Sequence, residues 1–131
     1  MKRQNISSGT EYEAIAGYSR AVRLGNVVHV SGTTATDGAD TIIGIGDSAA
    51  QTDFIIRKIE RALNQAGAQL SDVVRTRIYL APGADWEAVA RAHGKYFGDI
   101  RPANTLLFIH ALVGDDYLVE MEAEAIIASA S

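Results

Sequence analysis

The amino-acid sequence predicts an α+β protein whose helices pack on one face of a mixed sheet. Two segments carry apolar residues at three- and four-residue spacing, the period of a helix, and four others are short runs rich in β-branched residues. Along the chain they follow one another as strands, helix, strand, helix and two strands. In this order both helices return the chain to the sheet, which is typical of the α+β class.

The length and composition predict a single domain over residues 1–131. A chain of this size buries about two-thirds of its unfolded surface, so it needs no cross-links. The absence of cysteine excludes disulfides, thiolate nucleophiles and cysteine-ligated metal centres. No segment approaches the roughly 18 apolar residues of a membrane span, and no apolar core follows Met1–Asn5 as in a signal peptide. We therefore expect a cytoplasmic protein with no membrane partner.

The charge balance argues against nucleic acid as a partner. The chain has 12 basic and 16 acidic residues, a net charge of −4, and no basic stripe that would follow a phosphate backbone. The three histidines, His29, His93 and His110, lack the spacing of metal ligands, so we expect no metal site.

Both helices have recognisable ends. The first is predicted from Asp47 or Ser48, either of which can act as N-cap, to Ala66, and Gly67 is a suitable residue to end it. The second is predicted over residues 85–98.

The strands are predicted where apolar and branched residues concentrate: Val27–Val30, Val73–Leu80, Thr105–Ala111 and Leu118–Ala128. Strict alternation in the second of these places Val73 and Arg75 on one face and Val74 on the other. The last two strands are expected to form a hairpin.

Three carboxylates share one face of the last strand: Glu120, Glu122 and Glu124. They can pair with Arg75 and Arg77 if the two strands are neighbours. Such ion pairs within the sheet are enough to explain Glu122 and Glu124 without a functional role. Glu120 lies at the start of its strand, just after a turn, and strand ends commonly border clefts. It is therefore the candidate functional residue of the row.

Ser31 and Gly32 follow the Val27–Val30 strand. A nucleophilic serine on a sharp strand-to-helix turn needs the pattern Gly-x-Ser-x-Gly, which is absent around Ser31. We interpret Ser31 as a hydrogen-bonding wall of a pocket.

Several of these residues belong to a pattern that resembles the RidA/YjgF family, also described as endoribonuclease L-PSP or reactive intermediate/imine deaminase. The resemblance covers about residues 15–127. Five segments carry it in the family's order: Gly17–Val22, Gly25–Gly32, Asp72–Leu80, Tyr96–Ala103 and Leu118–Ala123.

The resemblance implies a fold, an assembly and a chemistry. The fold is chorismate-mutase-like, a mixed six-stranded sheet with two helices on one face. The assembly is a homotrimer with clefts between subunits, each holding a small-molecule ligand without metal or cofactor. In the deaminase branch these clefts hydrolyse 2-aminoacrylate and related imines or enamines to 2-keto acids and ammonia.

Four residues of this chain match the family's site. Glu120 corresponds to the catalytic glutamate that positions or activates water. Tyr18, Ser31 and Gly32 correspond to residues that line the substrate pocket.

One position departs from the family. Where the family reads Pro-Ala-Arg-Ser/Thr, this chain has Asn104 in place of the arginine, followed by Thr105. Losing a charge-assisted pair to the substrate carboxylate costs about 1.5–3 kcal/mol, so we do not expect a standard 2-aminoacrylate deaminase. Asn104 and Thr105 are then hydrogen-bonding residues of the pocket, although an asparagine at a strand start also pairs locally. Arg101 and Arg20 are the residues that could supply the missing charge.

The sequence leaves three functions open. The first is a trimer that binds a small polar or carbonyl/imine-type metabolite in clefts between subunits. The second is an enamine or imine deaminase that releases a 2-keto acid and ammonia. The third is a non-catalytic ligand-sensing or chaperone-like trimer. The acidic charge balance disfavours a ribonuclease.

Overall fold

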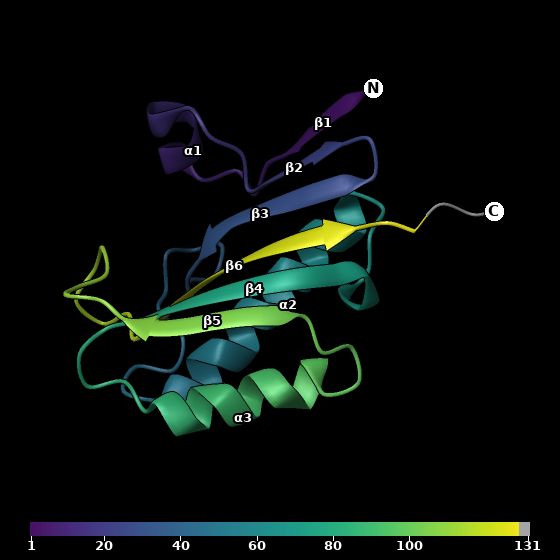
Figure 1. The fold of residues 1–131 in the computed structure, drawn as a ribbon. Helices are drawn as coiled ribbons and strands as arrows, with labels where there is room; N and C mark the ends of the chain where they lie inside the picture. The colour runs from purple at the N-terminus through teal and green to yellow at the C-terminus, as the bar shows by residue number, and fades with distance from the viewer. Residues whose placement is uncertain (129–131) are drawn as a thin grey trace.

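The computed structural model describes residues 1–128 as a six-stranded sheet with helices on one side (Figure 1). The strands are β1 (Arg3–Ile6), β2 (Ala21–Leu24), β3 (Val27–Thr33), β4 (Val73–Leu80), β5 (Ala103–Phe108) and β6 (Val119–Ile126). The helices are α1 (Glu11–Ala16), α2 (Ser48–Gln65) and α3 (Trp86–Phe97), with a short 3-10 turn, η1 (Leu70–Asp72). The strand order is β1-β2-β3-β6-β4-β5, and the sheet is mixed because β4 and β5 alone are parallel. This confirms the predicted fold class.

The two long helices begin and end where the sequence predicts. The side chain of Asp47 accepts a hydrogen bond from the Ala50 amide (3.0 Å) and caps α2, and Asp85 caps α3 in the same way. Gly67, just beyond α2, has φ +86°, a conformation that favours glycine. Within residues 1–128 neither helix is long and apolar enough to cross a bilayer.

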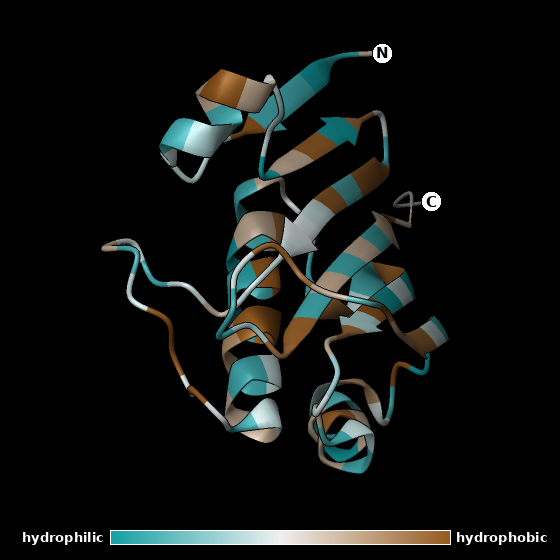
Figure 2. Ribbon diagram, turned by 90° about the vertical axis from the view of Figure 1, so that its left-hand side faces the viewer, coloured by the Kyte–Doolittle hydropathy of each residue, from teal (hydrophilic) through white to brown (hydrophobic). Residues whose placement is uncertain are grey.

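The core lies between α2, α3 and the sheet. Residues of one face of each element are buried there, as the alternating brown and teal bands along the strands illustrate (Figure 2). The largest fully buried side chains include Ile55, Ile56, Ile59, Leu63, Ile78 and Met121. The opposite face of the sheet is left without helices (Figure 1).

The predicted hairpin of the last two strands is wrong. β6 lies between β3 and β4 and is antiparallel to both, whereas β5 pairs in parallel with β4 at the edge of the sheet. The reason is α3, which returns the chain so that β5 runs alongside β4 in the same direction. β5 also begins earlier and ends earlier than predicted, at Ala103 and Phe108.

The alternation predicted for β4 fails at its first residues. Val73 is buried with the core and Val74 is 41% exposed. The register against β6 shifts between Val73 and Arg75. This irregularity is typical of a β-bulge. It places Val73 on the helix-covered face, although Arg75 and the odd-numbered residues after it lie on the opposite face.

The expected charged ladder is present on the face without helices. Nη1 of Arg77 lies 2.8 Å from Oε1 of Glu124 and 3.8 Å from Oε2 of Glu122. The Tyr79 hydroxyl also donates to Glu122. Arg75 is level with Glu124 but makes no ion pair within residues 1–128. The hypothesis that Glu122 and Glu124 serve the sheet itself is therefore supported.

Candidate functional site

Glu120 lies at the start of β6 with its carboxylate against the backbone of Gly32. Its neighbours Val119 and Met121 are fully buried on the helix side, so the Glu120 side chain lies on the opposite face. A methyl group on Gly32 would come within 2.2 Å of Oε2 of Glu120. Gly32 lies in an irregular part of β3, where the register against β6 shifts between Val30 and Thr33. A glycine is needed here for the close approach of the carboxylate, not for an unusual φ.

The environment of Glu120 favours its protonated form. Burial raises the pKa of this carboxyl, and the neighbouring Glu122 carboxylate raises it further, against an opposing effect of the positive charge of Arg20. A glutamate with a raised pKa can both accept and donate a proton nearer to neutral pH than an exposed one.

Arg20 lies at the same place, between β2 and the end of β3. Its Nη1 donates to the carbonyl oxygen of Gly32 (2.8 Å) and to Oγ1 of Thr33 (3.0 Å). The ring of Tyr18 packs against it, with 5.8 Å between the ring centroid and Cζ of Arg20. Gly32 thus has the Glu120 carboxylate near its Cα and the Arg20 guanidinium on its carbonyl.

Ser31 holds the segment that carries Tyr18 and Arg20. Its hydroxyl donates to the carbonyl oxygen of Ser19 (2.7 Å), and its amide donates to that of Arg20 (3.0 Å). The hydroxyl proton is therefore used in a structural bond, in keeping with a wall residue and not with a nucleophile.

Lys58 is a neighbour of the site that the sequence analysis missed. It projects from α2, and its Nζ donates to the carbonyl oxygens of Thr34 and Thr36, both at 2.8 Å. Burial, assisted by the charges of Arg20 and Arg61, lowers the pKa of Lys58 to about 8. The available signal was helical spacing, because position 58 lies three residues after the buried Ile55.

The other two predicted site residues lie elsewhere in the chain. Nδ2 of Asn104 donates to Oγ1 of Thr76 (3.0 Å), which in turn lies 2.9 Å from Nε2 of His93 on α3. Asn104 is thus on the helix-covered side, opposite to Glu120. Thr105 pairs with Arg77 and lies on the open face, but on β5, two strands from β6.

One chain therefore brings together Tyr18, Ser31, Gly32 and Glu120, and adds Arg20. Asn104 and Thr105 do not join them. Of the two arginines considered as substitutes for the missing charge, Arg20 is beside Glu120. Arg101 precedes β5 at the opposite end of that strand from the level of Glu120.

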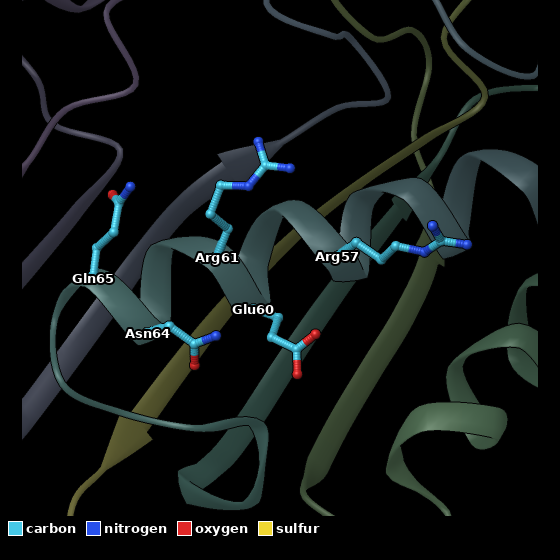
Figure 3. Close-up of a pocket in the computed structure, with 5 residues that line it drawn as sticks. All are labelled: Arg57, Glu60, Arg61, Asn64 and Gln65. Atoms are coloured by element: carbon cyan, nitrogen blue, oxygen red, sulfur yellow. The ribbon is translucent and has the colours of Figure 1, made fainter.

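Two hollows on the surface are separate from this cluster. One, of about 500 Å³, lies along the exposed face of α2, where Arg57, Glu60 and Arg61 extend away from the sheet (Figure 3). A second lies between α2 and α3. Both belong to the helix layer, so neither includes Glu120. Within residues 1–128 no three histidines or carboxylates gather as metal ligands.

The mixed six-stranded sheet with its two long helices has the YjgF fold, as its superposition on a solved structure shows. A family model described as endoribonuclease L-PSP matches residues 8–127, and the chain belongs to this family. A crystal structure from Mycobacterium tuberculosis, of a member of the YjgF/YER057c/UK114 family, superposes with a TM-score of 0.86 at 46% identity, covering 96% of this chain and all of that one.

Two curated relatives cover most of both chains. An uncharacterized protein of Streptomyces coelicolor is 38% identical over 122 residues, which are 93% of this chain and 90% of the relative. The 3-aminoacrylate deaminase RutC of Acinetobacter baylyi is 34% identical over 111 residues, 85% of this chain and 87% of the relative. A deaminase-type role is therefore represented in the family at this level of similarity.

Proposed function

We propose that the protein is a homotrimer that binds a small metabolite of the carbonyl or imine class in clefts between its subunits, and that Glu120 acts on the bound molecule. The observation that carries this proposal is the partly buried Glu120 carboxyl, with its raised pKa, held against Gly32 beside Tyr18 and Ser31.

The need for a second copy is supported by what one chain leaves open. The sheet face opposite the helices has no covering element, and Leu107, which pairs with Tyr79 on that face, is 40% exposed. Asn104 and Thr105 also lie away from Glu120 within one chain. A neighbouring copy on this face would cover Leu107 and could bring its β5 towards Glu120.

The chemistry best suited to Glu120 is hydrolysis of an imine or of the imine form of an enamine. Water adds through its oxygen to the imine carbon, and the Glu120 carboxylate takes the proton that the water loses. The protonated carboxyl then gives that proton to the nitrogen, which yields a carbinolamine. Glu120 next takes the proton of the carbinolamine hydroxyl and returns it to the nitrogen, so that the carbon–nitrogen bond breaks, ammonia leaves and the oxygen forms a carbonyl. A carboxyl with a raised pKa is suited to both transfers.

The substrate is expected to differ from 2-aminoacrylate. Asn104 stands at the arginine position of the family pattern and is bonded to Thr76, so it provides no cation there. The name of the Acinetobacter relative, a 3-aminoacrylate deaminase, supports an enamine as the substrate class.

The test is turnover of a panel of small enamines and imines, including 2- and 3-aminoacrylate generated in situ, measured as ammonia release. We expect hydrolysis of at least one compound, little acceleration with 2-aminoacrylate, and a loss of at least a hundredfold in Glu120→Gln, since a general acid–base group contributes about 10²–10⁴-fold. Glu87→Gln, an exposed carboxylate on α3, is the matched control and should retain full activity.

Two results would contradict this proposal. Turnover that persists in Glu120→Gln would remove that residue from the chemistry. Binding of these compounds without any turnover would favour the ligand-sensing or chaperone-like trimer instead.

A further inference from the structure

We propose that Arg20 is the anion-binding group of this site and that the ligand therefore carries a carboxylate. The inference rests on the proposed function in one respect, namely that the ligand occupies the Glu120 site. It gives the anion-binding role to Arg20, which immediately precedes β2, and not to position 104 on β5, where the family pattern has its arginine.

The guanidinium of Arg20 is fixed along one edge and free along the other. Nη1 takes both protein acceptors, the Gly32 carbonyl and the Thr33 hydroxyl. The buried Nε has no hydrogen-bond partner in the part of the chain that the structure describes, and no acceptor there bonds Nη2. An arginine has five N–H donors, and the Nε–Nη2 edge is one that binds a carboxylate through two parallel hydrogen bonds.

The charge of Arg20 also lacks a counter-ion. None of the ion pairs within residues 1–128 includes Arg20, and Glu120 affects it only as a nearby charge beyond ion-pair distance. A partly buried cation without a paired anion is costly. Binding a ligand carboxylate would offset that cost, so the site favours an anionic ligand over a neutral one.

A second cation lies close to Arg20. Lys58 projects from α2 and holds the carbonyl oxygens of Thr34 and Thr36, just beyond Gly32, and the positive charge of Arg20 acts on it. The acidic groups that act on Lys58 or on Glu120 are Asp37 and Glu122. Neither Arg20 nor Lys58 forms an ion pair within residues 1–128, so both cations favour an anionic ligand over a neutral one.

Access to the free edge involves Tyr18. Its side chain is 41% exposed and packs over the guanidinium, and no residue of the structure covers it fully. In this proposal a rotation of the Tyr18 ring admits the carboxylate, after which the ring lies against the ligand. The reacting carbon would then face Glu120 across Gly32.

The experiment compares a small 2-keto acid, 2-oxobutanoate, with its neutral amide, 2-oxobutanamide, by isothermal titration calorimetry. With the unaltered protein we expect the acid to bind at least tenfold more tightly than the amide. In Arg20→Gln the affinity for the acid should fall by about tenfold to a hundredfold, the range of a charge-assisted pair, while that for the amide stays within twofold. Arg20→Lys keeps the charge but loses the planar guanidinium, so its affinity for the acid should lie between those of the unaltered protein and of Arg20→Gln.

Arg101→Gln is the matched control, because it removes an exposed arginine near the position that departs from the family pattern, and it should bind like the unaltered protein. Equal binding of acid and amide by the unaltered protein, or a preference for the acid that survives in Arg20→Gln, would overturn the inference. The comparison of acid with amide uses the unaltered protein alone, so it does not depend on the folding of any variant. For the comparison between the unaltered protein and its variants, the folding of each protein is checked by circular dichroism.

The same experiment separates this inference from the proposed function. Glu120→Gln should lose turnover, while its preference for the acid over the amide should persist and should disappear when Arg20→Gln is added. Acid binding that depends on Arg20 in a protein without hydrolytic activity would overturn the hydrolysis and leave the carboxylate site standing.

Discussion

At the scale of single residues, the contact between Gly32 and Glu120 decides where the carboxylate lies. An alanine at position 32 is compatible with the backbone, because φ there is not in the positive range. Its methyl group would nevertheless come within 2.2 Å of Oε2 of Glu120 and would push the carboxylate aside. The atom that must move is the free end of a flexible side chain, so the fold should tolerate the change.

We predict that Gly32→Ala lowers kcat/KM at least tenfold and shifts the melting temperature by no more than about 2 °C, which corresponds to less than about 1 kcal/mol for a chain of this size. Steady-state kinetics and calorimetry measure the two quantities. Gly38→Ala is the control, because nothing lies within 4 Å of a methyl group there. A fully active Gly32→Ala enzyme would show that the position of the carboxylate does not matter.

The sequence was sufficient to single out Glu120, because alternation and the preceding turn place it on one face at the start of a strand. Its contact with Gly32 could not be predicted. It depends on the register shift in β3, which brings together residues that are 88 positions apart. Arg20 was a candidate on charge alone, whereas its free edge is visible only once its hydrogen bonds are known.

At the scale of elements, α2 contributes more than its apolar stripe. Lys58 connects it to the segment that follows β3 through the carbonyls of Thr34 and Thr36. The Thr36 hydroxyl also bonds that of Tyr117, which lies shortly before β6. One lysine thus stabilises the link between the helix layer and the loops beside the site.

This arrangement predicts how stability changes with pH. The pKa of Lys58 is about 8 in the folded protein and close to 10.5 in the unfolded chain. Between these values the unfolded chain holds more protons, so the free energy of unfolding should rise with pH from about 8 to about 10.5. A neutral amine keeps two N–H donors, so both carbonyl bonds persist.

The measurement is urea unfolding at pH 7.5 and pH 10.5 for the unaltered protein and for Lys58→Met. We expect the gain in stability with pH to be smaller in Lys58→Met, and Lys95→Met, which removes an exposed lysine on α3, to behave like the unaltered protein. An identical pH response in Lys58→Met and the unaltered protein would contradict the prediction.

Elements were predictable where local chemistry defines them and not where pairing does. The caps Asp47 and Asp85 and the spacing of buried residues located α2 and α3 closely. The predicted hairpin failed because two successive strands look the same in sequence whether they pair with each other or lie on either side of β4. Only the resemblance to a known family supplied the six-stranded arrangement.

At the scale of the whole molecule, the sheet face without helices is the reason to predict that copies of the chain associate. Leu107 lies on this face at the level of Glu120, since both pair with Tyr79, and its side chain is 40% exposed. Covering such side chains is a common driving force for association.

We predict a particle of three times the 14.0 kDa chain mass in sedimentation equilibrium. Leu107→Asp should shift the protein towards monomers and reduce turnover in parallel, because a charge would be buried without a partner. Val113→Asp is the control, since Val113 is 96% exposed in a loop away from the strands. A monomeric unaltered protein that is fully active would rule out a site shared between copies.

The bond from Asn104 to Thr76 has a consequence for attempts to redesign this protein. Asparagine at 104 is part of a chain of polar contacts that runs through Thr76 to His93 beneath the sheet. An arginine at position 104 would replace the asparagine amide that donates to the buried Thr76 hydroxyl and would place a longer, charged side chain beside Thr76 and His93. An engineer who wants the ordinary arginine site would have to redesign Thr76 and His93 together with position 104.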